Sequence, residues 1–376
     1  MEDTRNDALN ELFDVLAEEL NISKTMEEKA VSGYRSVGSW LDGDERIPSS
    51  EIYAQGSFNL GTVIRPLCGE DSDYDIDLVY HMPSMAYADA SMIKKIPGER
   101  LKEHGTYAGK LEPEGKRCWT LDYDGFHMDI LPCTTDVSSS SETAIRLTHR
   151  EDWGWYSDRY SDPKEYAKWF EGRMGDVLYA AKKRYASKVF CSVEEVQTYQ
   201  VRTPLQKAIQ ILKHHRNLMF DGKDNAPISI IITTLAAWAY KGESGTYDCV
   251  RRILDDMDSL IELRGGEYWI PSPVDSSENF ADKWNENPDK VRAFFRWLYQ
   301  ARSDIEVLEQ SNGMVALGGA LAAFAGEIMS KRTLEKHGRS LKNARESRAL
   351  FASAAGVTKC RTDGSVRVKD HAFYGF

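Results

Sequence analysis

The sequence predicts an α+β protein of two lobes, in which a mixed β-sheet occupies the N-terminal lobe and helices form the C-terminal lobe. Strand-like runs are confined to the first half of the chain, whereas apolar residues at helical spacing dominate from residue 162 onward. A chain of 376 residues is long enough for two modest domains. We therefore expect a first lobe over residues 1–200 and a second over residues 201–376.

Two amphipathic helices are expected before the first strand. Residues 8–20 place leucines and a phenylalanine every three or four positions, which is the spacing of one helix face. A second helix is expected to begin at Thr25, where Glu28 would complete a capping box, and to end near Gly43.

Strand-like segments follow and would build the sheet. They lie at residues 51–54, 76–80, 116–123 and 126–131. Pro132 is expected to end the last of them, because proline cannot donate a backbone hydrogen bond to a neighbouring strand. The polar, serine-rich stretch 134–141 is expected to be a loop.

The helical half begins with a strong capping signal. Thr203 can cap a helix, Pro204 suits its first position, and Gln206 stands where a capping box requires a glutamine or glutamate. Later helices are expected at residues 226–241, 246–263, 288–303, 313–330 and 340–355.

The chain is acidic, with 48 Lys and Arg against 59 Asp and Glu and a net charge of −11. Such a surface repels phosphate backbones, so constitutive nucleic-acid binding is disfavoured. The longest apolar run, residues 228–240, is too short to span a membrane, and the charged start of the chain contains no apolar signal segment. The six cysteines form no CxxC pair, which disfavours a zinc site and suits free thiols. We expect a cytoplasmic protein.

Asp75 and Asp77 form the most informative pair of residues. Side chains alternate along a strand, so both aspartates project to one side while Ile76 and Leu78 project to the other. Two carboxylates this close repel each other unless a cation lies between them. Mg²⁺ is the natural cation, because it prefers oxygen ligands and retains several waters.

Asp129 supplies a third carboxylate if its strand neighbours the first. Three aspartates can hold two Mg²⁺ ions about 3.5–4 Å apart, an arrangement that activates an attacking hydroxyl and stabilises a leaving pyrophosphate. Upstream, Gly56 would let the backbone approach a phosphate closely, and the Ser57 hydroxyl could donate to its oxygens. This ordered set predicts a metal site that binds a triphosphate.

Each part of the set also has an ordinary structural explanation. An Asp-x-Asp pair alone is common in surface turns, and the acidic run at 70–77 lacks the spacing of an EF-hand calcium loop. His127 could share the face of Asp129, although a packed strand histidine is the simpler interpretation. His214 and His215 are interpreted as surface or cap residues. The tryptophans at positions 153, 155 and 169 are interpreted as core residues.

Together these motifs resemble the nucleotidyltransferase superfamily of DNA polymerase β. More narrowly, the chain is similar to the bacterial cGAS/DncV-like nucleotidyltransferases (CD-NTases), the cyclic oligonucleotide synthases of the CBASS anti-phage systems. The segments that mark the superfamily are Gln55–Thr62, Tyr74–Val79 and His127–Pro132. The segments that mark the narrower family are Ser161–Lys164 with Trp169–Phe170, and Pro204–Arg216.

The resemblance implies a polymerase β-like fold whose helical lobe closes over the nucleotide. The family's ligands for two Mg²⁺ ions, which Mn²⁺ can replace, correspond to Asp75, Asp77 and Asp129. Its nucleotide-binding residues correspond to Gln55, Gly56, Ser57, Lys213 and Ser229. The position of Lys213 agrees with this role, since it continues the apolar stripe of Leu205 and Ile209, where a lysine either extends to the surface or faces a cleft.

The resemblance also implies template-independent synthesis of a cyclic di- or trinucleotide from ATP, with or without other nucleoside triphosphates. Two alternatives stay open, namely a linear oligoadenylate synthase or RNA-end nucleotidyltransferase, and a non-catalytic nucleotide sensor. Related synthases work with E1/E2-like or HORMA-type partners. The aromatic C-terminus, His371–Phe376, could dock onto such a partner or onto its own domain.

Overall fold

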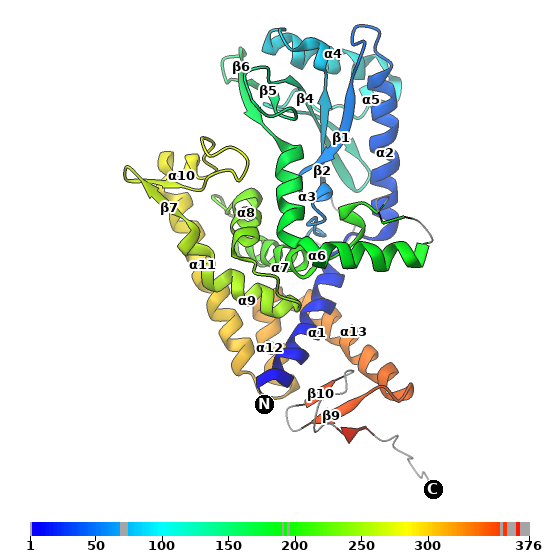
Figure 1. Cartoon of the computed structure of the whole chain (residues 1–376), viewed down its shortest axis with the longest axis vertical. Helices are drawn as coiled ribbons and strands as arrows, with labels where there is room; N and C mark the ends of the chain where they lie inside the picture. The colour runs from blue at the N-terminus through cyan, green and yellow to red at the C-terminus, as the bar shows by residue number, and fades with distance from the viewer. Residues whose placement is uncertain are drawn as a thin grey trace. The chain divides into compact units, whose positions relative to one another are not determined.

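The computed structural model describes residues 2–67, 74–189, 192–193, 196–353, 356–358 and 366–368. The chain forms two compact units (Figure 1). We call Ile22–Val201 the sheet unit, and Met1–Asn21 together with Arg202–Phe376 the helical unit. The expected α+β class, with a mixed sheet and a helical part, is confirmed. The C-terminal residues 371–376, proposed as a docking segment, lie outside the described residues.

The sheet unit contains a mixed sheet and the helices that cover it. The strands are β1 (Glu51–Gln55), β2 (Tyr74–His81), β3 (Trp119–Tyr123), β4 (Phe126–Thr135), β5 (Ile145–Arg150) and β6 (Tyr156–Ser161). The helices are α2 (Lys24–Asp42), α3 (Gly56–Asn59), α4 (Ala90–Glu103), α5 (Gly105–Ala108) and α6 (Pro163–Val189). Short 3₁₀ turns lie at η1 (Pro83–Met85) and η2 (Thr198–Gln200).

The strand order is β1-β2-β4-β5-β6, and β3 pairs with β4 beside β5. β2 and β4 run parallel, while the other paired strands are antiparallel. Parallel strands need a long crossover, and here the segment between β2 and β4 contains α4, which packs on β4, β5 and β6. The crossover therefore brings two segments about fifty residues apart in sequence into direct contact.

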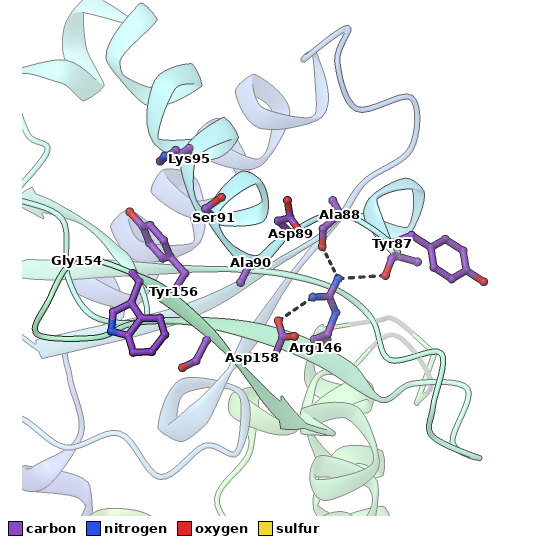
Figure 2. Close-up of a pocket in the computed structure, with 13 residues that line it drawn as sticks. Tyr87, Ala88, Asp89, Ala90, Ser91, Lys95, Arg146, Gly154, Tyr156 and Asp158 are labelled. Carbon is purple, nitrogen blue, oxygen red and sulfur yellow. Dashed lines mark hydrogen bonds and ion pairs between the residues drawn. The ribbon is translucent and has the colours of Figure 1, made fainter.

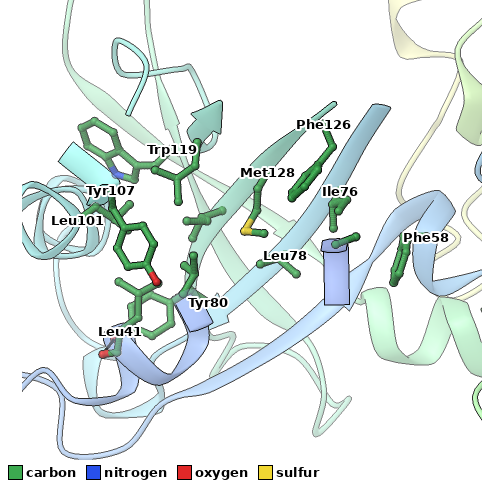
Figure 3. Close-up of a cluster of buried hydrophobic side chains, with 14 of the residues drawn as sticks. Leu41, Phe58, Ile76, Leu78, Tyr80, Leu101, Tyr107, Trp119, Phe126 and Met128 are labelled. Atoms are coloured by element: carbon green, nitrogen blue, oxygen red, sulfur yellow. Dashed lines mark hydrogen bonds between the residues drawn. The ribbon is translucent and has the colours of Figure 1, made fainter. Parts of the chain in front are cut away.

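One face of the sheet forms the main hydrophobic core (Figure 3). Ile76 and Leu78 of β2 and Met128 of β4 are fully or almost fully buried on this face, where Leu41 of α2 and Leu101 of α4 join them. Burying a large apolar side chain stabilises a fold by about 1.5–3 kcal/mol, so this face fixes which way each strand points. The alternate residues of β2 and β4 must then lie on the opposite face.

Pro132 lies inside β4, and the expectation that it would end the strand was wrong. The ladder with β3 ends at Ile130 and the ladder with β5 begins at Cys133, so Pro132 interrupts neither of them. The strand continues to Thr135, where Val79, Cys133 and their neighbours form a small second cluster.

Strands β5 and β6 and the bend in α6 were not predicted. β6 has no buried residue and lacks a clean apolar alternation. The α6 helix begins after Asp162, whose Oδ1 accepts from the backbone N–H of Glu165 at 3.1 Å. It bends at Gly175, where φ is 45°, as Figure 1 shows.

The helical unit is built from helices and a few short strands. Its helices are α1 (Glu2–Leu20), α7 (Pro204–Met219), α8 (Ser229–Ala239), α9 (Thr246–Asp256), α10 (Asp282–Glu286), α11 (Pro288–Gln310), α12 (Met314–Ala325) and α13 (Glu327–Glu346), with a 3₁₀ turn at η3 (Met257–Leu260). The short strands are β7 (Glu262–Arg264), β8 (Glu267–Trp269), β9 (Phe351–Ser353), β10 (Gly356–Thr358) and β11 (Val366–Arg367). In the described part of the chain, no helix combines the length and apolarity that a membrane crossing needs.

Helix α1 packs with the helical unit, whereas the expected division at residue 200 assigned it to the first lobe. Its apolar face is buried against α7, α9 and α13. Phe13 lies at its centre, with its ring centroid 5.3 Å from that of Tyr247 and 5.8 Å from that of Phe324. The apolar periodicity located this helix correctly, but it carries no information about which half of the chain will cover that face.

Capping signals were right for one helix and misplaced elsewhere. Thr203 and Gln206 form the predicted reciprocal capping box at the start of α7. By contrast, Ser23 rather than Thr25 caps α2.

Two expected helices have other boundaries in the structure. Gly326, with φ at 81°, divides the expected helix 313–330 into α12 and α13. The expected helix 340–355 was also wrong, because α13 ends at Glu346 and β9 follows.

Candidate active site

A row of polar residues crosses four strands on the face opposite the main core. Gln55 of β1 pairs with Asp77 of β2, Asp77 pairs with Asp129 of β4, and Asp129 pairs with Thr120 of β3. Directly paired residues carry their side chains on the same side of a sheet. Asp75 belongs to this face too, two residues before Asp77, so the structure brings the three predicted aspartates onto one face.

His127 lies on the same face and pairs with Asp75. Its Nδ1 lies 3.9 Å from Oδ1 of Asp75, and its Nε2 lies 3.6 Å from Oδ1 of Asp122 and 3.9 Å from Oε1 of Glu112. The imidazole is thus surrounded by carboxylates and keeps 28% of its side-chain surface exposed. The interpretation of His127 as a packed strand histidine was wrong.

Asp129 is held by a side chain from the neighbouring strand. The Oγ1 of Thr120 donates to Oδ1 of Asp129 at 2.5 Å. Cys118, two residues earlier, places its Sγ 3.7 Å from the same Thr120 oxygen. Burial, reinforced by the charge of Asp129, raises the pKa of the Cys118 thiol to about 11, so the thiol keeps its proton at neutral pH. No pattern in the sequence pointed to either neighbour of Asp129.

Gly56 is the first residue of α3, directly after β1, and adopts a left-handed backbone conformation with φ at +62°. A Cβ at this position would lie 2.3 Å from Oδ2 of Asp77. Both the backbone angle and the lack of space therefore require glycine. Ser57 follows in the first turn of α3 and is half-buried.

The aspartates fit a divalent cation in two respects. Carboxylate oxygens are the donors that Mg²⁺ prefers, and Asp75, Asp77 and Asp129 offer them from adjacent strands on a shared face. Within the segments that the structure describes, no three His, Cys, Asp or Glu side chains already converge as a ready metal cluster. The three aspartates therefore suit a divalent cation in the type of donor atom and in the sheet face that they share, and this supports a proposal that they are metal ligands.

Two sequence comparisons agree with this arrangement. Residues 8–173 match the family profile described as "Second Messenger Oligonucleotide or Dinucleotide Synthetase domain", a range that contains all three aspartates. A c-di-GMP synthase of Roseivirga ehrenbergii is 29% identical over 371 residues, which cover 96% of this chain and 95% of the relative.

Solved structures share the fold. The CD-NTase CdnG of Bradyrhizobium diazoefficiens, in complex with GTP, matches with a TM-score of 0.69 at 20% identity, over 88% of this chain and 100% of that one. CdnC of Escherichia coli, in complex with HORMA, matches with a TM-score of 0.60 at 16% identity, over 84% of this chain and 96% of that one. The cyclic AMP-GMP synthase DncV of Vibrio cholerae matches with a TM-score of 0.54 at 15% identity, over 88% of each chain.

Residues 8–173 thus match the second messenger synthetase family, and the chain has the fold of the solved CD-NTase structures. The expected polymerase β-like fold is thereby confirmed. The chain carries its aspartates in the sheet unit, on the strands that the family resemblance indicated.

The remaining predicted nucleotide-binding residues of this chain lie in the helical unit. Lys213 is buried on α7, with 5% of its surface exposed. Ser229 begins α8, and its Oγ accepts from Nη2 of Arg216 at 3.2 Å. Burial lowers the pKa of Arg216 to about 10. Ser229 thus has a structural partner, and the contact of Lys213 and Ser229 with a triphosphate stays a prediction.

His214 and His215 are both buried, so their interpretation as surface or cap residues was wrong. The Nε2 of His214 lies 2.9 Å from the carbonyl oxygen of Ala325. The indole N–H of Trp297 donates to Nδ1 of His215 at 3.1 Å. Because Nδ1 accepts, Nε2 carries the ring proton and donates a hydrogen bond to Oδ2 of Asp304 at 3.0 Å. The two histidines therefore anchor α7 inside the helical unit.

A hollow of about 800 Å³ lies elsewhere on the sheet unit, beside the start of α4 and the β5–β6 hairpin (Figure 2). Arg146 stands in its wall and donates to Asp158 and to the carbonyl oxygen of Ala88, both at 2.7 Å. None of the predicted site residues lines it. Trp155, which does, is 68% exposed and Trp153 is 93% exposed, so their interpretation as core residues was wrong.

Proposed function

We propose that this chain joins nucleoside triphosphates, ATP among them, into a cyclic di- or trinucleotide second messenger for anti-phage signalling. The observation that carries the proposal is the parallel register of β2 and β4, which pairs Asp77 with Asp129 and leaves Asp75 on the same face. The c-di-GMP synthase relative supports a cyclic product. Because the substrates are triphosphates, we place the reaction in the cytoplasm.

We assign Asp75, Asp77 and Asp129 as ligands for two Mg²⁺ ions, which Mn²⁺ could replace. When bound, such ions lower the barrier by activating a ribose hydroxyl and stabilising the charge that collects on the leaving pyrophosphate. The face itself is otherwise rich in negative charge, with Asp122 and Glu112 close to His127. These carboxylates repel one another, and a bound cation would relieve the repulsion, which supports a cation site on this face.

The residues of the chain position the substrate. Gly56 carries no side chain, because a Cβ there would collide with Asp77, and its bare backbone supports our assignment of a phosphate contact at this turn. Gln55 lies in the same row as Asp77 and can offer its amide N–H, while the Ser57 hydroxyl can donate from the next turn. We assign Lys213 and Ser229 to triphosphate binding on the family resemblance alone.

In the proposed reaction the oxygen of a ribose 3′ or 2′ hydroxyl attacks the α-phosphorus of a second nucleotide. The bond between that phosphorus and the bridging oxygen breaks, pyrophosphate leaves, and the hydroxyl proton passes to solvent. A second attack within the linear intermediate closes the ring.

The test is incubation of the purified chain with the four labelled nucleoside triphosphates and Mg²⁺ or Mn²⁺, followed by phosphatase and mass analysis. A phosphatase-resistant cyclic product is the expected result. A product that phosphatase degrades from its 5′ end would indicate the linear synthase, and nucleotide binding with no pyrophosphate release would indicate a sensor.

Two double variants with the same change in charge distinguish loss of the proposed metal ligands from a general effect of removing negative charge. Asp75→Asn with Asp77→Asn should abolish synthesis while the protein stays folded. Asp221→Asn with Asp224→Asn changes the charge equally, at exposed loop positions, and should leave synthesis unchanged. Synthesis that survives in the first variant would refute the site assignment.

A regulatory partner of the E1/E2-like or HORMA type stays a prediction for this chain. The HORMA complex belongs to CdnC, and the likeness to it is one of fold. If no product forms, addition of such a partner is the next arm of the experiment.

A further inference from the structure

We propose that Thr120 is a positioning residue for Asp129, fixing one carboxylate oxygen so that the other is presented to a cation. The inference rests on the proposed function, since it assumes that Asp129 is a metal ligand. It adds that β3, a strand that contributes none of the predicted ligands, sets the affinity of the site for its metal.

The first step is the contact itself. Thr120 and Asp129 are directly paired across β3 and β4, and the threonine Oγ1 donates to Oδ1 of the aspartate at 2.5 Å. Hydrogen bonds from a hydroxyl to an ionised carboxylate are short and about twice as strong as those between neutral groups. Because the pairing is set by the backbone ladder, the hydroxyl is aimed at Asp129 before any ligand binds.

The second step concerns the single hydroxyl proton of Thr120. A threonine hydroxyl has one proton, and here it is given to Asp129. The contact between Thr120 and the Cys118 sulfur, at 3.7 Å, must therefore be donated by the thiol. The direction of the chain of hydrogen bonds is thereby fixed, from Cys118 through Thr120 to Asp129.

The third step is the anchoring of this short segment. The carbonyl oxygen of Cys118 accepts from Nζ of Lys94 at 2.8 Å, and Lys94 on α4 is fully buried. The indole N–H of Trp119 donates back to the carbonyl oxygen of Lys94, also at 2.8 Å. Residues 118–120 are thus tied to α4 by two bonds in opposite directions, which prevents the Thr120 hydroxyl from drifting away from Asp129.

The consequence for a cation is specific. With Oδ1 accepting from Thr120, Asp129 would hold a cation chiefly through Oδ2. Side chains that orient a metal ligand typically change metal affinity about 10–100-fold when removed. Loss of the Thr120 hydroxyl should therefore weaken the binding of metal more than the binding of nucleotide.

The experiment compares three single variants of the full chain. Thr120→Val keeps the shape of the side chain and removes the hydroxyl, whereas Thr120→Ser keeps the hydroxyl. Thr148→Val is the matched control, because Thr148 is a fully buried threonine of β5 whose hydroxyl has no hydrogen-bond partner among the described residues. Each protein is titrated with Mn²⁺ in the presence of a non-hydrolysable triphosphate analogue, and binding is followed by the electron paramagnetic resonance of free Mn²⁺. Synthesis is measured against Mg²⁺ concentration in parallel.

Thr120→Val should weaken Mn²⁺ binding and raise the Mg²⁺ requirement, each by about 10-fold, with a smaller change in the KM for nucleotide. Thr120→Ser and Thr148→Val should stay close to the wild type. Unchanged Mn²⁺ binding in a folded Thr120→Val protein would overturn the role of Thr120 and leave the metal site standing. A wild type that binds no Mn²⁺ would overturn the metal assignment itself, and this inference with it.

Discussion

The Cα of Gly56 faces the carboxylate of Asp77 so closely that a methyl group at position 56 would lie 2.3 Å from Oδ2. No unbonded carbon and oxygen atoms come this near, so either the backbone or the aspartate would have to move. The relationship connects the glycine-serine turn with the carboxylate pair, two motifs that lie about twenty residues apart in the sequence.

Replacing Gly56 with alanine should reduce cyclic nucleotide synthesis at least 100-fold, because it displaces Asp77 as well as straining the turn. Strain alone, from a φ of +62°, should cost about 1–2 kcal/mol of unfolding free energy. Initial rates of product formation and urea unfolding measure the two effects separately.

The matched control for this prediction is Gly222→Ala. Gly222 has a φ of +64°, and a Cβ there would meet nothing within 4 Å. The Gly222→Ala protein should therefore lose about as much unfolding free energy as Gly56→Ala does through strain, and it should keep full synthetic activity. Equal activity loss in both variants would show that strain, and not contact with Asp77, explains the effect.

Gly98→Ala should destabilise the sheet unit, because the added methyl would lie 2.1 Å from the ring of Trp119. Overpacking a filled core costs about 1–3 kcal/mol. Gly172→Ala is the control, since it is also a helical glycine but a Cβ there meets nothing within 4 Å. That variant should gain about 0.5–1 kcal/mol. Urea unfolding followed by tryptophan fluorescence compares them, and a stable Gly98→Ala protein would contradict the packing around Trp119.

Stability should fall as the pH drops below about 6.5, the ordinary pKa of histidine, partly because of His214. Burial lowers the pKa of His214 in the folded chain, so the unfolded chain binds the proton first and is favoured by acid. One such group contributes at most about 1.4 kcal/mol per pH unit. In His214→Gln, the amide can still donate to Ala325, and the difference in unfolding free energy between about pH 7.5 and 5.5 should shrink. An unchanged difference would mean that His214 is already charged in the fold.

Asp304→Ala should destabilise the helical unit by about 1–3 kcal/mol, because it leaves the buried Nε2–H of His215 without its acceptor. Asp304→Asn retains a carbonyl oxygen for that N–H and should cost less. Thermal unfolding, with Mn²⁺ binding as a second readout, checks that the loss is structural. Weaker Mn²⁺ binding in Asp304→Ala would argue against a purely structural pair.

Local patterns predicted the residues of the site better than their surroundings. Alternation along β2 was enough to place Asp75 and Asp77 on one face, because the period of a strand is a property of its backbone. The same reasoning favoured the wrong environment for His127, since the choice between a packed and a polar face depends on the partner strand. The pairing of Asp77 with Asp129 likewise needed the parallel register, which the crossover between β2 and β4 determines.

The environment of single side chains was the least predictable feature. Trp153 and Trp155 are apolar in type yet exposed, while His214 and His215 are polar in type yet buried. A residue's own chemistry favours one environment only weakly. Its burial follows from which elements cover it, as α12 and α11 cover the two histidines through Ala325 and Asp304.

By itself the sequence determined the α+β class, the capping box of α7 and the three acidic residues proposed to bind metal, because each depends on neighbours a few positions apart. Only the tertiary structure decided that β2 and β4 lie side by side, that Thr120 holds Asp129, that Gly56 faces Asp77, and that α1 packs with the second half of the chain. These contacts join distant segments, and the burial of whole faces selects them, which no short stretch of sequence contains.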